Sequence, residues 1–375
     1  MANIEQRKAF GNFYAIPKPL AGAERLNCVD LYAGAGGFSL AAFNVGLSVK
    51  FAIEFDRHAC ATYRNNLCGE LGPQIYQEDV RKLDPKNIAK EHFSDDISCD
   101  LILGGPPCQG YSVHRIKGSG VDDPRNELLI RYFDFVRALK PKVFLMENVP
   151  GMLWPRHRKY VNRFYREAKK ADYVVAEPIL LEAADFGVPQ RRKRVFVLGV
   201  RKDVKLDLCW PPSGLYSENP DSSSELEKWR KATDIFRIPL PKNDPNNAHM
   251  NHGPELIAAF KKTPANGGSR AQSGRLLRCH RNHDGHKDVY GRIDPAKPGP
   301  TMTTACINPS KGRFVHPTKH HGITIRQAAR FQTFPDSFIF EGGLIASGVQ
   351  IGNAIPVVMG EALIREITEA LLYKP

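Results

Sequence analysis

The sequence of 375 residues contains no apolar run long enough to cross a membrane, and residues 1–11 lack the apolar core of a signal peptide. It has no internal repeat and no low-complexity tract. None of the eight cysteines forms a Cys-x-x-Cys pair, and their scattered spacing is typical of reduced thiols rather than of a disulfide framework. These absences exclude membrane-spanning, secreted and solenoid classes, and we expect a soluble cytoplasmic protein.

The sequence also has fewer acidic residues than basic ones. The chain has 40 Asp and Glu against 53 Lys and Arg, a formal net charge of +13. Most of the excess lies in residues 201–319, which hold 20 Lys and Arg against 12 Asp and Glu. Such a balance suits a polyanionic partner. The length allows two domains, or one large domain with an insertion.

A strand, a glycine turn and a helix are predicted near the start of the chain. Residues 26–31 form the strand, Tyr32 to Gly37 the turn and residues 38–45 the helix, which is the entry to a doubly wound nucleotide-binding sheet. A second strand ends at Glu54, where an acid commonly binds ribose hydroxyls, although a surface acid is the alternative. Asp79 follows a third strand and is equally consistent with an adenine ligand and a cap or turn acid.

A rigid turn carries Cys108. The buried strand 101–103 runs into Gly104 to Ser112, where two prolines fix the backbone just before the cysteine. A cysteine at the carboxyl end of a strand is well placed to act as a nucleophile, whereas a buried structural thiol is the alternative. A polar loop, residues 113–126, follows, and then an amphipathic helix over 127–139.

Two further patterns indicate functional groups at strand ends. A strand over 142–146 ends in Glu147, which is either a catalytic carboxylate or a capping acid. The basic run 191–194 precedes the strand 195–200, so strand alternation points Arg192 and Arg194 the same way. The run alone predicts a solvated face or a phosphate patch.

Residues 209–290 are rich in loop signals, with few and short strands or helices. A Cys and three His lie close together there, but without the spacing of a standard zinc finger, and we predict no metal site at Cys279, His280, His283 and His286. Thr324 is predicted to cap a helix, and Gln350–Pro356 to start the final helix over 357–372.

The motif around Cys108, Gly105–Ser112, resembles the catalytic motif of DNA (cytosine-5) methyltransferases of the bacterial restriction-modification type. The other matches keep the order of that family, and they are Asp30–Gly37, Glu54, Asp79, Glu147–Val149, Gln190–Arg194, Arg326–Asp336 and Gln350–Pro356. The resemblance covers about 26–200 and 290–375, and it departs at Val357, where many members have a second proline. It implies an α/β fold: a doubly wound, Rossmann-like methyltransferase domain with a smaller, irregular target-recognition domain.

The resemblance also implies roles. Cys108 attacks carbon 6 of the target cytosine, Glu147 protonates nitrogen 3, Arg194 binds the exocyclic oxygen, and Arg192 supports the same pocket. The cofactor is S-adenosylmethionine, and its implied contacts are Tyr32, Gly34, Gly36, Gly37, Glu54, Asp79, Pro107 and Asn353. The target base is flipped out of the duplex. The implied DNA contacts are Ser112, His114, Gly267, Gly268 and Arg270.

By the same resemblance, residues 26–200, completed by 346–375, form the catalytic domain. Residues 201–345 form the small domain, with target recognition at about 205–290. The implied partner is double-stranded DNA, with a cognate restriction endonuclease for the same site. We expect a monomer associated with the nucleoid. Two alternatives stay open, namely a transfer RNA cytosine-5 methyltransferase and a catalytically silent DNA-binding protein.

Overall fold

The computed structural model describes residues 18–70, 72–107, 127–274 and 288–373. Its strands are β1 (Asn27–Leu31), β2 (Ser48–Glu54), β3 (Gln74–Gln77), β4 (Leu101–Gly104), β5 (Val143–Asn148), β6 (Tyr173–Val175), β7 (Ile179–Glu182), β8 (Lys193–Arg201), β9 (Tyr216–Ser217) and β10 (Glu227–Lys228). Its α-helices are α2 (Gly37–Val45), α3 (Arg57–Leu67), α4 (Pro85–His92), α5 (Glu127–Leu139), α6 (Arg158–Lys170), α7 (Thr233–Arg237), α8 (Pro254–Lys262), α9 (Ile325–Phe331), α10 (Gly343–Asn353) and α11 (Val357–Leu372).

The main sheet has eight strands in the order β3-β2-β1-β4-β5-β8-β6, with β7 also paired to β8. Strands β1 to β5 are parallel, and β8 is antiparallel to β5, β6 and β7. The strand order reverses between β1 and β4, which is where ligands bind in doubly wound folds. The predicted α/β fold class is confirmed, and the carboxyl ends of β1, β4 and β5 are called the carboxyl edge below.

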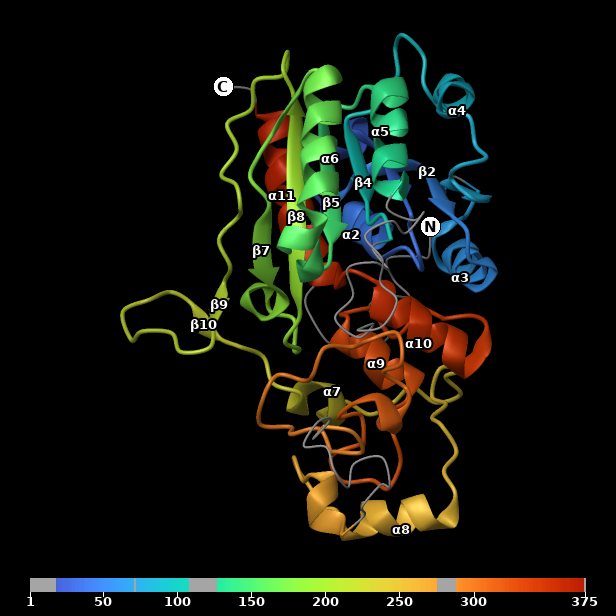
Figure 1. The fold of residues 1–375 in the computed structure, drawn as a ribbon, viewed down its shortest axis with the longest axis vertical. Coiled ribbons are helices and arrows are strands. Elements are labelled where there is room, and N and C mark those ends of the chain that lie inside the picture. The colour runs from blue at the N-terminus through green and yellow to red at the C-terminus, as the bar shows by residue number, and fades with distance from the viewer. Residues whose placement is uncertain (1–17, 71, 108–126, 275–287, 374–375) are drawn as a thin grey trace.

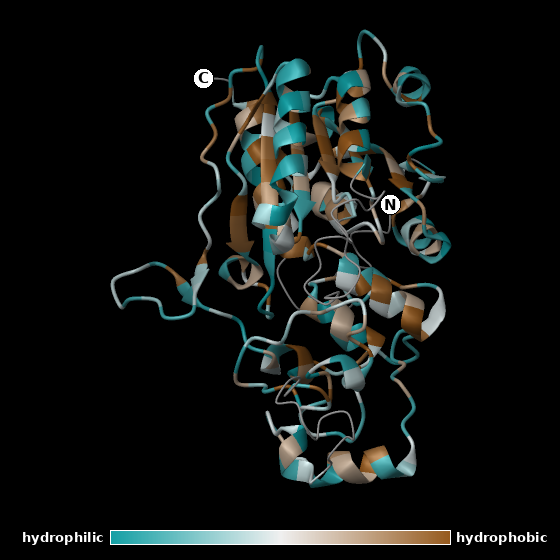
Figure 2. Ribbon diagram, in the orientation of Figure 1, coloured by the Kyte–Doolittle hydropathy of each residue, from teal (hydrophilic) through white to brown (hydrophobic). Residues whose placement is uncertain are grey.

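Strand alternation divides the apolar core between the two faces of this sheet. Leu101 and Leu103 of β4 pack with α2 and α11, whereas Ile102 between them packs with α5 and α6. Figure 1 shows α5 and α6 on one face of the sheet and α2 and α11 on the other. Apolar strands lie between helices whose outward surfaces are polar (Figure 2). Both faces are therefore covered, as a parallel sheet requires.

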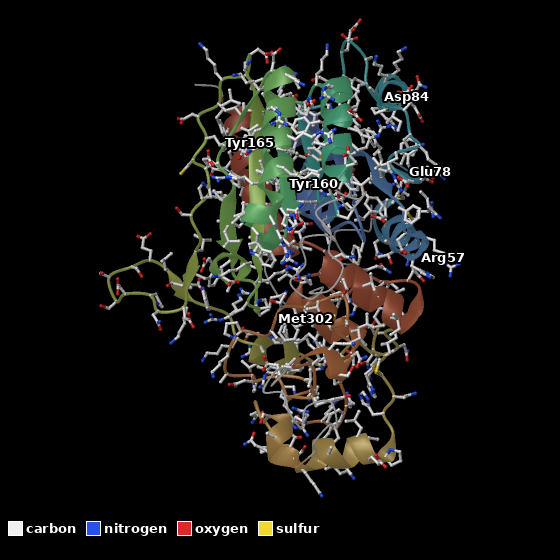
Figure 3. The ribbon with its side chains drawn as sticks, in the orientation of Figure 1. Arg57, Glu78, Asp84, Tyr160, Tyr165 and Met302 are labelled. Atoms are coloured by element: carbon white, nitrogen blue, oxygen red, sulfur yellow. The ribbon has the colours of Figure 1, made fainter. Side chains whose placement is uncertain are left out.

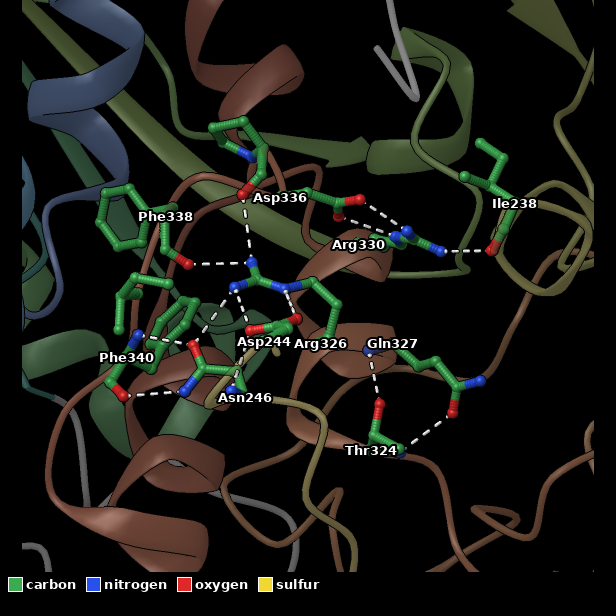
Figure 4. Close-up of polar contacts among 12 residues, drawn as sticks. Ile238, Asp244, Asn246, Thr324, Arg326, Gln327, Arg330, Asp336, Phe338 and Phe340 are labelled. Carbon is green, nitrogen blue, oxygen red and sulfur yellow. Dashed lines mark hydrogen bonds and ion pairs between the residues drawn. The ribbon is translucent and has the colours of Figure 1, made fainter. Parts of the chain in front are cut away.

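A second lobe, built around α7, α8, α9 and α10, lies at one end of the sheet (Figure 1). Arg326 of α9 forms a two-point ion pair with Asp244, with Nε–Oδ2 and Nη2–Oδ1 distances of 2.7 and 3.1 Å (Figure 4). Their side chains are 0% and 1% exposed. Arg330 is paired with Asp336 in the same way, at 2.6 to 2.8 Å. In a lobe with little regular structure, these buried guanidinium groups fix loops to one another.

Helix limits follow the predictions in part. The helices over 127–139 and 357–372 are confirmed as α5 and α11, and Thr324 caps α9 in a capping box with Gln327. The prediction for Gln350–Pro356 was wrong, because these residues end α10 and form the break before α11. A Cβ on Gly352 would lie 2.2 Å from the Thr304 nitrogen, so α10 packs its glycine directly onto main chain.

The expectation that no stretch is long and apolar enough to cross a membrane was wrong by length and composition alone, because Gly343–Leu372 meets that test. It is divided into α10 and α11, however, and 61% of its most apolar window is buried inside the protein. A core helix of this kind passes the same test, so the stretch carries no evidence for a membrane.

Candidate active site

The glycine turn after β1 lies at the carboxyl edge. Gly36 has φ 95°, and a Cβ on it would lie 2.4 Å from Leu67 Cδ1, so only glycine fits there. A Cβ on Gly37 would lie 2.8 Å from the Ile355 carbonyl oxygen, which brings the segment before α11 against the turn. Gly34, with φ 56°, has open space where a Cβ would be. The turn thus presents bare main chain at the edge where a nucleotide-like ligand would approach.

Glu54, the last residue of β2, lies against this turn. Its Oε2 accepts from the Gly34 N–H at 2.8 Å, and Oε1 accepts from the N–H groups of Phe55 and Asp56 at 2.8 and 2.7 Å. Burial raises the pKa of Glu54, against the lowering effect of these hydrogen bonds. Since a carboxylate oxygen accepts two hydrogen bonds, Oε2 keeps one acceptor position for a ligand hydroxyl.

Phe55 is a residue that sequence reasoning missed. Its ring is 72% exposed directly beside Glu54, which is unusual for phenylalanine. An exposed ring at a strand end is a surface on which a flat heterocycle can stack. An aromatic residue directly after the strand-end acid was the signal that could have identified it.

Asp79 and Tyr32 lie on the same side of the edge but have partners of their own. The Asp79 carboxylate is bonded to the Arg81 side chain, and these hydrogen bonds lower the pKa of Asp79 to about 2. It is therefore an ionised acceptor, suited to an amino group. The Tyr32 hydroxyl donates to the Leu128 carbonyl at 2.8 Å, so Tyr32 connects the turn to α5.

Glu147 and Arg194 form a buried pair at the ends of β5 and β8. Their Oε1–Nε distance is 2.7 Å, and the side chains are 14% and 13% exposed. Antiparallel pairing places Glu147 opposite Phe196, which brings Arg194 alongside. Burial raises the pKa of Glu147, and the charges of Arg194 and then Arg192 oppose that rise. Burial thus favours the protonated form of this carboxyl group, which is the form that a proton donor needs.

The segment that leads into Cys108 lies against this pair. A Cβ on Gly105 would be 3.2 Å from Glu147 Oε2, and the Asn148 side-chain nitrogen is 3.4 Å from the Pro106 carbonyl oxygen. Pro107 is half-buried and is the last described residue before the gap. Cys108, Ser112 and His114 lie outside the described residues, as do Cys279, His280, His283 and His286.

Arg192 is almost fully buried and does not bond to Glu147. Its Nη1 donates to the Met302 carbonyl at 2.8 Å, and its Nη2 donates to the carbonyls of Gly352 and Ala354 at 2.8 and 2.9 Å. Asn353, between those two carbonyls, is exposed. Arg192 and Arg194 both act on the charge of Glu147, but only Arg194 is in contact with it.

The predicted DNA-contacting residues form a tight turn in the second lobe. The Gly267 carbonyl accepts from Arg313 Nη1 at 3.0 Å, and the Gly268 carbonyl accepts from the Arg292 N–H at 2.9 Å. A Cβ on Gly268 would lie 2.1 Å from the Pro264 oxygen. Arg270 Nε and Nη1 are buried and have no hydrogen-bond partner among the described residues. Within the described ranges, no group of three or more His, Cys, Asp or Glu is arranged to hold a metal ion.

Comparisons with known proteins match nearly the whole chain to one family. Residues 26–369 match the family model described as C-5 cytosine-specific DNA methylase. The Type II methyltransferase M1.HphI of Haemophilus parahaemolyticus is 30% identical over 92% of this chain and 87% of its own length. The Type II methyltransferase M.DdeI of Desulfomicrobium norvegicum is 31% identical over 92% of this chain and 88% of its own length. A DNA modification methyltransferase encoded within an E. coli prophage superposes with a TM-score of 0.70, at 26% identity over 93% of this chain and 100% of the other.

Proposed function

The chain belongs to the C-5 cytosine-specific DNA methylase family, and from this premise we propose that it transfers the methyl group of S-adenosylmethionine to carbon 5 of a cytosine flipped out of duplex DNA. The observation that supports the proposal most directly is the buried Glu147–Arg194 pair beside the segment leading into Cys108. Carbon 5 is a poor nucleophile. The ring therefore needs a nucleophile at carbon 6 and a proton donor at nitrogen 3.

The side chains divide these tasks. The Cys108 thiolate adds to carbon 6, and the ring electrons that this addition releases make carbon 5 nucleophilic. Glu147 gives a proton to nitrogen 3 as negative charge builds there, and Arg194 holds Glu147 while it binds the exocyclic oxygen. As carbon 5 gains the methyl group, nitrogen 3 returns its proton to Glu147. The carbon 5 proton then passes to solvent, and the thiolate leaves carbon 6 as the double bond between carbons 5 and 6 forms again. Cys108 would attack as the thiolate, a form that nearby positive charge or dipoles favour.

The glycine turn and its neighbours fit the cofactor. The open main chain at Gly34, the acceptor position left on Glu54 and the exposed Phe55 ring suit a ribose and a stacked base. Asp79 would accept from the adenine amino group, and Asn353 would complete the site from the end of α10. S-adenosylmethionine, when bound, supplies an electrophilic methyl group. We assign Tyr32, Gly36, Gly37 and Pro107 to the same site.

The second lobe is assigned to DNA. We propose residues 201–345 as the small domain and about 205–290 as the target-recognition region, with residues 26–200 and 346–375 forming the catalytic domain. Arg270 is assigned to a guanine edge in the major groove. Because its Nε and Nη1 are buried in the free protein, that contact requires the side chain to turn outward when DNA binds. Ser112 and His114 would contact the strand that is opened, where base flipping costs a few kcal/mol.

Tritiated S-adenosylmethionine tests the proposal. Incubation with duplex DNA, with transfer RNA and with neither should label DNA alone. Duplex DNA that contains 5-fluorocytosine should cross-link to the wild type and not to Cys108→Ala. Labelled transfer RNA would support the alternative substrate, and no label on either would leave a silent DNA-binding protein. A monomeric, nucleoid-associated protein with a cognate endonuclease stays a prediction.

A further inference from the structure

Arg192 stands where the two lobes meet. Met302, whose carbonyl it binds, lies at the junction between the sheet and the second lobe (Figure 3). We propose that Arg192 is a positioning residue that couples the cofactor side of the site to the base side, acting through Asn353 and Arg194 rather than by contact with either ligand. The inference rests on the proposed function, since it concerns the same two ligands.

On the cofactor side, one nitrogen of Arg192 holds the main chain around Asn353. Arg192 Nη2 donates to both carbonyls that flank Asn353, at 2.8 and 2.9 Å, and this fixes the main chain that presents the exposed Asn353 side chain. One residue beyond Ala354, the Ile355 carbonyl contacts the glycine turn at Gly37. A shift of the Arg192 side chain therefore moves Asn353 relative to the turn.

On the base side, main-chain hydrogen bonds of Arg192 hold the start of β8, which carries Arg194. The Arg192 N–H donates to Glu182 Oε1 at 2.5 Å, and its carbonyl accepts from the Ala183 N–H at 2.8 Å. These bonds fix the backbone two residues before Arg194, whose guanidinium holds Glu147. Because the same residue is bound on both sides, the positions of Asn353 and Arg194 are not independent.

A lysine cannot replace this arrangement. Arg192 is 1% exposed, and its planar guanidinium reaches three carbonyls at once, whereas a lysine ammonium is a compact group on a flexible stem. Gln332 Nε2 also donates to the Ala354 carbonyl, at 2.8 Å, but the Gly352 carbonyl has no other hydrogen-bond donor among the described residues. Arg192→Lys should therefore loosen the Asn353 segment while it keeps the charge.

The matched control is Arg292→Lys. Arg292 is likewise 1% exposed and likewise holds carbonyls, among them those of Phe260 and His316 at 2.6 and 2.7 Å. Its carbonyl partners lie within the second lobe, away from β8 and from residues 352–354. If Arg192 only stabilised the fold, the two lysine variants would behave alike.

The experiment measures S-adenosylhomocysteine affinity by calorimetry and methyl-transfer kinetics on duplex DNA. Arg192→Lys should weaken S-adenosylhomocysteine binding by on the order of tenfold and lower kcat, whereas Arg292→Lys should leave S-adenosylhomocysteine affinity unchanged and reduce thermal stability. The combination of Arg192→Lys with Asn353→Ala should bind no more than about twofold more weakly than Asn353→Ala alone, because both changes act on one contact. Full additivity, or equal effects of the two lysine variants, would overturn the inference.

Two further measurements keep the test decisive. Should Arg192→Lys not fold, Glu182→Ala removes the acceptor of the Arg192 N–H, and a kcat that stays at the wild-type value in that variant would count against the coupling. Wild-type protein that binds S-adenosylhomocysteine but methylates no DNA would contradict the proposed function and not this inference. If the wild type methylates DNA and Arg192→Lys binds S-adenosylhomocysteine as tightly as the wild type does, the inference alone is contradicted.

Discussion

Replacement of Asp30 by asparagine should stabilise this protein above neutral pH. Asp30 lies in β1 below the glycine turn, is 1% exposed, and accepts from the N–H and the hydroxyl of Ser39 through one oxygen, at 3.1 and 2.7 Å. Burial raises the pKa of Asp30 from 3.8 to about 7, the Ser39 hydrogen bonds oppose the rise, and the charge of Glu54 adds to it. The fold therefore favours the neutral carboxyl group.

The magnitude follows from the linkage between protonation and folding. A carboxyl group with a raised pKa gives its full contribution to stability below pH 3.8, and that contribution is lost as the pH rises through about 7. The difference between 3.8 and about 7 corresponds to about 4 kcal/mol, of which about 2–3 kcal/mol accumulates between pH 5 and pH 8. Asparagine accepts the same two hydrogen bonds and does not titrate.

Urea unfolding of wild type and Asp30→Asn at pH 5, 6, 7 and 8 measures this difference. The gain from Asp30→Asn should grow with pH by about 2–3 kcal/mol. Asp100→Asn is the control, because Asp100 is also buried but has Lys142 Nζ at 2.7 Å, so its removal breaks an ion pair and should not stabilise. A stability difference between wild type and Asp30→Asn that stays constant from pH 5 to pH 8 would refute the reasoning.

Four further outcomes are expected. Glu147→Gln should lower kcat by about 10²–10⁴-fold with DNA affinity retained. The wild-type single-turnover rate should fall as the pH rises through the raised pKa of Glu147, and the rate of the variant should lack this fall. Glu54→Ala and Asp79→Ala should weaken S-adenosylhomocysteine binding in calorimetry more than DNA binding, and unchanged affinity in both would remove these residues from the cofactor site. Asp244→Asn should cost about 3–5 kcal/mol in urea unfolding, because a buried charge loses its partner; a cost below about 1 kcal/mol, as at exposed pairs, would contradict this. Arg270→Ala should relax one position of the target sequence by about 1–3 kcal/mol in bisulfite mapping of a random DNA library, whereas a uniform drop would indicate a phosphate contact.

The sheet and the long amphipathic helices could be predicted because their signals are local. The apolar spacing of α5 and α11 gave their limits to the residue, and the strand-end positions of Glu54 and Glu147 followed from the strands themselves. Helix α10 was missed because its glycines disfavour a helix, and the packing of Gly352 on Thr304 outweighs that propensity.

The buried arginines could not be predicted, because their partners lie far away in the sequence. Arg192 binds carbonyls 110 to 162 residues further along the chain, and Arg326 binds an acid 82 residues before it. A basic run predicts a solvated face, and only the assembled fold supplies enough carbonyl and carboxylate oxygens to bury such a charge. The unbonded N–H groups of Arg270 are equally invisible in the sequence.

The packing of α11 on α2 has a consequence for how the protein is made. Helix α2 is complete early in synthesis, but the helix that covers the sheet beside it is the last one in the chain, after 171 further residues have followed the end of β8. At elongation rates of about 5–20 residues per second this interval is roughly 9–34 s. For that time all strands of the main sheet have been synthesised, but α11, which packs beside α2 on one face, has not. A nascent chain that has not reached α11 therefore leaves open to solvent the apolar residues that pack against this helix in the folded protein.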